Sequence, residues 1–160
     1  MKFSETFTYS DTDVESVYAL VSDAAFREES AAKSGGTEIE VTVDPYGDGH
    51  VVTIVRSQTA DMPDVIKKFV GDTVKVKQTE TWGGPDASGN RSADLKFTVI
   101  GQPADMIGTA TLTQGDDPLF TLEGDVKVNV PFLGKKIEPE IVKAIVAGVR
   151  YDVDLGNERL

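Results

Sequence analysis

The sequence predicts an α+β domain in which a curved antiparallel sheet wraps around one long C-terminal helix. Two observations predict it: segments with strand-like alternation fill the middle of the chain, and one wide apolar stripe with helical spacing lies near its end. Such a stripe must be buried, and the apolar face of an antiparallel sheet offers the matching surface. The chain has 160 residues, so residues 1–160 are expected to form a single domain.

The first strand is expected over residues 2–9, and two short helices should follow it. Its inward face carries three aromatic residues and one carboxylate: Phe3, Glu5, Phe7 and Tyr9. Ser10 or Asp11 is the expected N-cap of the first helix, because short polar side chains accept hydrogen bonds from free backbone N–H groups. Asp23 is the expected N-cap of the second helix, which should stop at Gly35 and Gly36.

Six further strands are predicted over residues 37–43, 50–57, 73–82, 92–101, 105–114 and 118–130. Turns rich in Gly, Pro and Asp separate most of them. A short helix is expected over residues 64–70, between the second and third of these strands. The segment 50–57 is too apolar for its alternation to assign an inward face.

The last element should be the longest helix. Pro139 lacks an amide donor and fits best in a first turn, so the helix is expected to begin between Lys136 and Glu138 and to run toward Leu155, before Gly156. Its stripe consists of branched aliphatic residues: Ile141, Val142, Ile145, Val146, Val149 and Val153. Small residues, among them Gly148, let the helix approach the sheet closely or leave space beside it.

Composition excludes several classes of function. The chain has no cysteine and only one histidine, His50, so it can hold no disulfide, thiolate site or multi-histidine metal centre. Its net charge of −11 disfavours nucleic acid and anionic membranes as partners. No secretory signal or membrane-spanning segment is visible, which predicts a cytoplasmic protein. No metal or cofactor is predicted, and a protein partner cannot be named.

The strand 73–82 contains a contradiction. One face carries Lys75 and Lys77 and should be exposed to solvent, so the other face should be buried. That other face nevertheless mixes polar with apolar residues: Val74, Val76, Gln78, Glu80 and Trp82. A desolvated Glu80 would have a raised pKa and could act as a general acid or base. Glu5 on the first strand is the second, weaker candidate.

Structural explanations compete with catalysis. The strand can extend beyond the packed core, so that Glu80 meets water, or a bulge can shift its register. A basic neighbour can also neutralise Glu80 or Glu5, with Arg56 and Arg91 as the candidates. Tyr9, Tyr18 and Tyr151 could offer hydroxyl groups to a ligand, although each also fits an amphipathic core position.

Four segments carry a resemblance to a known superfamily: "VSDAAFRE" (21–28), "DMPDVIKKFVGD" (61–72), "TETW" (79–82) and "NVPFLGKKIEPEIVKAI" (129–145). With this order of elements, the chain resembles the START-like, polyketide-cyclase-like superfamily, also called SRPBCC, whose members have a helix-grip fold. The segments look most like an uncharacterised, mainly actinobacterial family labelled as a domain of unknown function. None of them is a catalytic signature.

The resemblance implies a cavity between the sheet and the long helix, used by relatives for lipids, sterols or polyketides. We therefore expect a small hydrophobic or amphipathic ligand and no catalysis. The residues expected to line the site come from the strands and the helix: Val76, Gln78, Glu80, Trp82, Leu95, Phe97, Met106, Ala110, Leu122, Ile141, Ile145, Gly148 and Val149. The alternatives are a cyclase- or hydrolase-like enzyme with an inward glutamate as general base, and a protein-interaction module without a pocket.

Overall fold

In the computed structural model, the described residues 1–59 and 63–160 form a seven-stranded sheet and the helices that pack on it. The side chains of residues 65, 66 and 69 also lie outside this description, as do the first two residues of the segment 61–72. The elements in chain order are β1 (Lys2–Thr8), α1 (Val14–Val21), α2 (Ala24–Lys33), β2 (Thr37–Tyr46), β3 (Gly49–Thr59), α3 (Asp64–Val70), β4 (Thr73–Trp82), β5 (Arg91–Val99), β6 (Ala104–Thr113), β7 (Leu119–Val128) and α4 (Gly134–Arg159).

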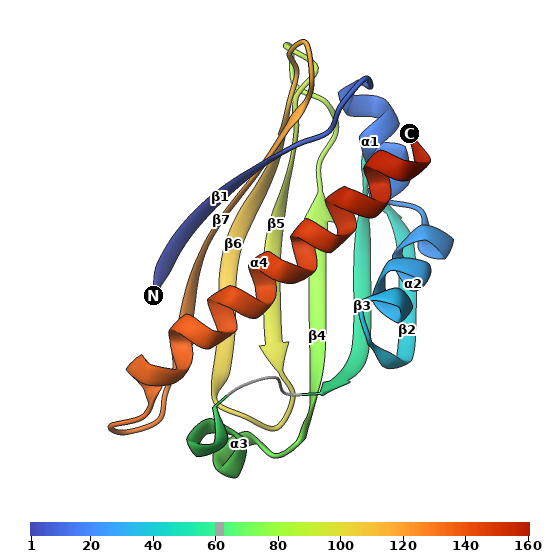
Figure 1. Cartoon of the computed structure of the whole chain (residues 1–160). Coiled ribbons are helices and arrows are strands. Elements are labelled where there is room, and N and C mark those ends of the chain that lie inside the picture. The colour runs from blue at the N-terminus through green and yellow to red at the C-terminus, as the bar shows by residue number, and fades with distance from the viewer. Residues whose placement is uncertain (60–62) are drawn as a thin grey trace.

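The sheet has the order β1-β7-β6-β5-β4-β3-β2, and every neighbouring pair is antiparallel. Figure 1 shows α4 running diagonally across one face of the curved sheet. The helices α1 and α2 lie near the C-terminal part of α4, and α3 lies at the opposite end of the sheet. The predicted α+β architecture, a curved antiparallel sheet around a long C-terminal helix, is confirmed.

The strand β4 resolves the contradiction in its sequence by burying its polar groups. Gln78, Glu80 and Trp82 are 6%, 5% and 1% exposed, whereas Lys75 and Lys77 on the opposite face are exposed. The pairing of β4 with β3 and β5 is continuous in register, without a bulge. The inward parity read from the sequence is therefore correct, and the expectation that Glu80 meets bulk water is wrong.

The cap of α1 differs from the prediction. The N-cap is Asp13, whose Oδ1 accepts a hydrogen bond from the backbone N–H of Ser16 at 2.7 Å. Asp11 instead turns the chain with a φ of 57°, and its backbone N–H donates to Asp117. The cap of α2 is Asp23, as predicted. Several Asx and Ser residues before α1 could cap it, and local sequence does not rank them.

The helix α4 is longer at both ends than predicted. It begins at Gly134, so Pro139 lies inside the helix rather than at its start, and it continues past Gly156 to Arg159. Gly156 does not end the helix but permits a close contact, because a Cβ at this position would lie 2.9 Å from the Tyr9 ring. None of the described helices is long and apolar enough to cross a membrane.

Candidate functional site

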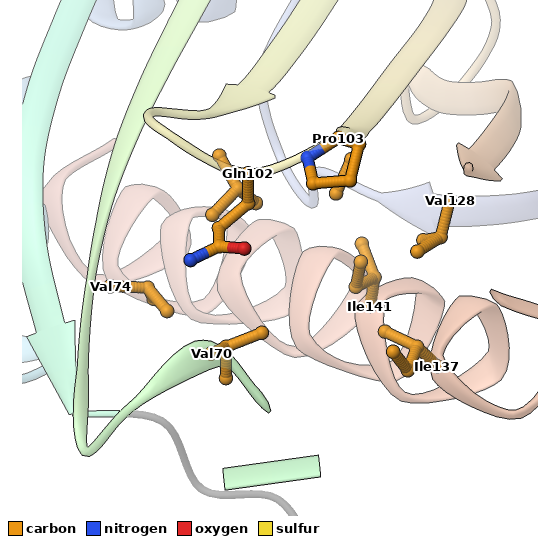
Figure 2. Close-up of a pocket in the computed structure, with 9 residues that line it drawn as sticks. Val70, Val74, Gln102, Pro103, Val128, Ile137 and Ile141 are labelled. Carbon is orange, nitrogen blue, oxygen red and sulfur yellow. The ribbon is translucent and has the colours of Figure 1, made fainter. Parts of the chain in front are cut away.

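Among the described residues, two hollows can be defined between the sheet and α4. The first, which we call the polar hollow, is lined by residues of β1–α1–α2, of the sheet and of α4: Tyr9, Val21, Phe26, Arg27, Gln78, Glu80, Trp82, Leu95, Phe97, Phe120, Leu122, Val149 and Asp152. The second, the α3 hollow, lies at the other end of α4 and is lined by Val70, Val74, Val99, Gln102, Pro103, Ala104, Val128, Ile137 and Ile141. Figure 2 shows side chains from α3, the β5–β6 turn and α4 around the α3 hollow.

Both hollows are small. Each has a cavity volume of about 30 Å³, which holds on the order of two water molecules. Pockets for drug-sized ligands measure roughly 300–1,000 Å³. The structure therefore describes a closed molecule, in which α4 and its neighbours must move before a lipid-sized molecule could enter.

Glu80 is the most densely bonded polar group of the polar hollow. Its Oε1 accepts hydrogen bonds from Arg27 Nη1 and Trp82 Nε1, both at 3.0 Å. Its Oε2 accepts from Arg27 Nη2 at 2.6 Å and from Gln78 Nε2 at 2.5 Å. Two carboxylate oxygens offer about four acceptor sites, so all of them are used within the protein.

The protonation state of Glu80 follows from these contacts. Burial alone would raise the pKa of this carboxyl, but the Arg27 charge and the hydrogen bonds from Arg27, Trp82 and Gln78 hold the pKa below its ordinary value. For Arg27, burial lowers the pKa, and the charges of Glu80 and Asp152 more than restore it. An ionised carboxylate without a free lone pair cannot serve as a general base. The geometry does not fit the catalytic role considered for Glu80.

Asp152 on α4 is the second carboxylate of the polar hollow. Its Oδ1 accepts a hydrogen bond from the Ser30 hydroxyl of α2, and its Oδ2 lies 3.8 Å from Arg27 Nη2. The Asp152 side chain is 28% exposed, so it lies at the edge of the buried network. Burial raises its pKa, which Arg27 and Ser30 partly offset. Asp152 thus connects α4 to α2 and keeps unused acceptor capacity.

Arg56 on β3 extends the network without closing it. Its Nη1 donates to Gln78 Oε1 at 3.3 Å, and its buried Nε–H has no hydrogen-bond partner among the described residues. Burial lowers the pKa of Arg56, whereas the nearby Asp152 charge raises it. The sequence proposed Arg56 as a partner of Glu80, but in the structure Gln78 stands between them.

The other expected partner, Arg91, belongs to a separate cluster around α1. Its guanidinium lies 3.7 Å from the centre of the Tyr18 ring, and its Nε donates to Glu15 at 3.1 Å. The Tyr18 hydroxyl lies 2.5 Å from Nδ1 of His50, the only histidine. Arg91 therefore anchors α1 to the sheet, and the suggested pairing of Arg91 with Glu80 or Glu5 is wrong.

The structure separates the two candidate glutamates. Glu5 is half-buried on β1, opposite Leu122 of β7, and three strands lie between β1 and β4. At about 4.8 Å per strand, four strand spacings amount to roughly 19 Å. Glu5 and Glu80 do not form one site.

The residues expected to line a ligand site are divided by the structure into three groups. Seven of them line the polar hollow: Gln78, Glu80, Trp82, Leu95, Phe97, Leu122 and Val149. Ile141 lines the α3 hollow. Five others line neither of these hollows: Val76, Met106, Ala110, Ile145 and Gly148. Met106 and Ala110 are packed in the core with 1% and 0% exposure. That these residues bind a ligand stays a prediction.

Two charged residues of the polar hollow were missed by sequence reasoning. Arg27 lies on the buried side of α2 together with Ser30 and Ala31, at helical spacings of three and four. Asp152 precedes the buried Val153 near the end of α4. A charged residue within an apolar helical stripe is the signal that could have found Arg27; Asp152 carries no comparable signal.

Comparison with protein families gives one match that covers nearly the whole chain. The family described as "Protein of unknown function (DUF2505)" matches residues 4–160. Uncharacterised proteins of Mycobacterium tuberculosis and Mycobacterium bovis are each 29% identical to this chain over 105 residues. The match covers 62% of this chain and 60% of each relative, so the chain spans about three fifths of their length.

Solved structures share the fold at low sequence identity. The protein TTHA0849 from Thermus thermophilus has a TM-score of 0.62 and 16% identity, with 99% of this chain and 96% of that chain covered. The Zhui aromatase/cyclase from Streptomyces sp. R1128 has a TM-score of 0.61 and 9% identity, covering 99% and 92%. Human STARD10 has a TM-score of 0.55 and 13% identity, with 95% of this chain and 63% of that chain covered. These similarities confirm the START-like, polyketide-cyclase-like helix-grip fold.

Proposed function

The chain belongs to the DUF2505 family of proteins of unknown function, and we propose that it binds a small hydrophobic or amphipathic molecule between the sheet and α4. The polar hollow carries this proposal, because it combines apolar walls with a few fixed polar groups. Ligand sites in proteins have this composition: apolar lining provides affinity, and a small number of polar groups orients the ligand. The fold shared with an aromatase/cyclase and with STARD10 supports a ligand site at this place.

Binding requires a local opening of the molecule. The α3 hollow and the polar hollow lie at two ends of the same helix–sheet gap, and each admits only a few atoms. Val149 and Ile141 on α4 are half-buried and line one hollow each. A small displacement of α4 would enlarge both hollows at once. We expect the bound form to differ from this closed form mainly in the position of α4.

Native mass spectrometry after incubation with fatty acids, sterols and aromatic polyketides tests the proposal. We expect one compound class to be retained at one molecule per chain, because the two hollows share a single gap. Retention must persist after buffer exchange. If no compound is retained, and none of them shifts the amide NMR signals of α4, the protein does not bind this class of ligand.

A protein-interaction module is the second candidate function. The small volumes of both hollows favour it, since large side chains fill most of the helix–sheet gap. Phe132 at the corner before α4 is 98% exposed, which gives such a module an apolar contact point. Phe132→Ser should weaken capture of a partner from a native lysate without changing the retention of small molecules. Unchanged capture would count against this candidate.

A further inference from the structure

The polar groups around the polar hollow differ in how much hydrogen-bonding capacity they have left. Glu80 accepts four hydrogen bonds, and the Trp82 Nε1–H is used in one of them. Gln78 donates to Glu80 and accepts from Arg56. Arg27 directs its two terminal nitrogens to Glu80 and to the Val21 carbonyl. Glu80 and Trp82 are thus fully used, whereas the bonds named here occupy three of the five N–H groups of Arg27 and half of the capacity of the Gln78 amide.

Among the lining polar groups that the structure describes, Tyr9 and Asp152 use the smallest part of their hydrogen-bonding capacity. Tyr9 is 1% exposed and lines the hollow, and its hydroxyl makes no hydrogen bond to any of the described residues. Burial and then the charge of Asp152 raise the pKa of this hydroxyl, so it stays protonated and can both donate and accept. Oδ1 of Asp152 accepts a hydrogen bond from Ser30. Oδ2 lies 3.8 Å from Arg27 Nη2, which is beyond hydrogen-bond distance.

Basic and acidic side chains are equal in number around the hollow. Two guanidinium groups, Arg27 and Arg56, lie with two carboxyl groups, Glu80 and Asp152. A ligand carboxylate would add a third acidic group to this place, and a ligand ammonium a third basic one, each without a partner of its own. An uncharged polar group leaves the balance intact.

We infer that the polar hollow selects an uncharged molecule with an alcohol or phenol group on an apolar body. The ligand hydroxyl donates to Asp152 and accepts from the Tyr9 hydroxyl, and the apolar body lies against Leu95, Phe97 and Val149. The present cavity has room for a hydroxyl-sized end, and the body requires the opening described above. This inference rests on the proposed function and adds the class of ligand to it.

Three probes of similar shape test the inference: 2-naphthol, 2-methylnaphthalene and 2-naphthoate. Their affinities are measured at pH 7 by equilibrium dialysis against the whole chain. We expect 2-naphthol to bind about tenfold more tightly than 2-methylnaphthalene, as two hydrogen bonds in a buried place would give. The anionic 2-naphthoate should bind more weakly than 2-naphthol, because of the two carboxylates.

Variants assign the preference to the two side chains. Tyr9→Phe removes only the hydroxyl and should reduce the affinity for 2-naphthol about three- to tenfold, with that for 2-methylnaphthalene unchanged. Asp152→Asn should reduce the same preference. The matched control is Tyr151→Phe, which removes a hydroxyl from the neighbouring, exposed position of α4 and should change neither affinity.

The outcomes separate this inference from the proposed function. If 2-naphthol and 2-methylnaphthalene bind equally, if 2-naphthoate binds most tightly, or if Tyr9→Phe and Asp152→Asn keep the preference, the inference is wrong while ligand binding stands. If none of the three probes binds, the proposed function fails on these ligands and the inference fails with it. A preference for 2-naphthol that both variants abolish supports the inference.

Discussion

Arg27 of α2 and Glu80 of β4 form a bidentate ion pair that joins the helix to the sheet. The two residues are 53 positions apart in the chain, and both are about 5% exposed. Desolvating such a pair is unfavourable unless the remaining hydrogen bonds are also satisfied. Gln78, Trp82 and the Val21 carbonyl satisfy them here. The pair therefore fixes where α2 sits over the polar hollow.

Removing Arg27 should destabilise the fold strongly. In Arg27→Met, Glu80 loses its buried partner, and breaking a buried ion pair typically costs about 3–5 kcal/mol of unfolding free energy. The double variant Arg27→Met/Glu80→Met should recover part of this loss, because it removes both charges. Urea denaturation at pH 7 measures the unfolding free energies of the wild type, the single variant and the double variant.

The control for this prediction is Lys33→Met, which removes the exposed partner of Glu29 on the same helix. An exposed pair contributes about 0–1 kcal/mol, so this variant should unfold close to the wild type. A loss in Arg27→Met no larger than in the control would show that the buried pair does not position α2.

Acid should reveal opposite contributions from Glu80 and Asp152. The pKa of Glu80 is lowered in the folded state, so its stabilising contribution is present above the unfolded value of 4.5 and is lost as the pH falls through the folded pKa. The pKa of Asp152 is raised above 3.8, so its contribution is present below 3.8 and is lost as the pH rises through the folded pKa.

Single substitutions separate these contributions. The stability that Glu80→Gln loses at pH 7 should shrink as the pH is lowered below about 4.5. The stability of Asp152→Asn relative to wild type should instead rise as the pH increases from about 3.8. Urea denaturation at several pH values from about 2.5, below both unfolded pKa values, to neutrality gives both slopes. Slopes of the same sign would contradict the assigned pKa directions.

The sequence predicted the inward face of β4 but not the partner of Glu80. Alternation along a strand is a local pattern, so it identifies Gln78, Glu80 and Trp82 as neighbours on one face. Which helix covers that face depends on the packing of distant segments. The two arginines considered from the sequence lie on the sheet, Arg56 beside Gln78 and Arg91 under Tyr18, whereas the true partner, Arg27, comes from α2.

The size of the cavity could not be predicted from the sequence. The aliphatic stripe of α4 and the inward sheet residues were identified, but the gap between them depends on side-chain packing at close to crystal density. Ile145 is an example: it lies on the predicted stripe and was expected to line a ligand site. It is instead packed in the core and lines neither hollow. The sequence predicts that α4 ends before Gly156, because a contact of this glycine with Tyr9 is not visible in local sequence.

Two glycines of α4 should respond in opposite ways to substitution by alanine. In Gly156→Ala, the new Cβ would lie 2.9 Å from Cε1 of the Tyr9 ring, which is 1% exposed and cannot move freely. Overpacking of this kind costs roughly 1–3 kcal/mol. This cost equals or exceeds the gain of about 1 kcal/mol from helix propensity. We expect lower thermal stability.

Gly148→Ala is the matched control within the same helix. Its Cβ would meet no atom within 4 Å, so only the gain in helix propensity of up to about 1 kcal/mol remains. Calorimetry should therefore show a raised Tm for Gly148→Ala and a lowered Tm for Gly156→Ala. Equal shifts would mean that α4 does not press on Tyr9 as the structure describes.

Filling the polar hollow should block ligand binding while preserving the fold. Val149→Phe places a larger side chain into the hollow from α4, at a cost in stability of about 1–3 kcal/mol. We expect the affinity for the uncharged fluorescent probe N-phenyl-1-naphthylamine to fall at least tenfold. Ala147→Phe, an exposed position two residues earlier on α4, is the control and should leave the affinity unchanged.

A second substitution identifies which hollow receives the probe. Ile141→Phe fills the α3 hollow instead, where the described lining offers little polar contact to orient a ligand. If the site is the polar hollow, Ile141→Phe should weaken binding less than Val149→Phe, because the probe can still enter beside Tyr9 and Asp152. The reverse order would move the site to the α3 end of the gap, and the polar network around Glu80 would then serve stability alone.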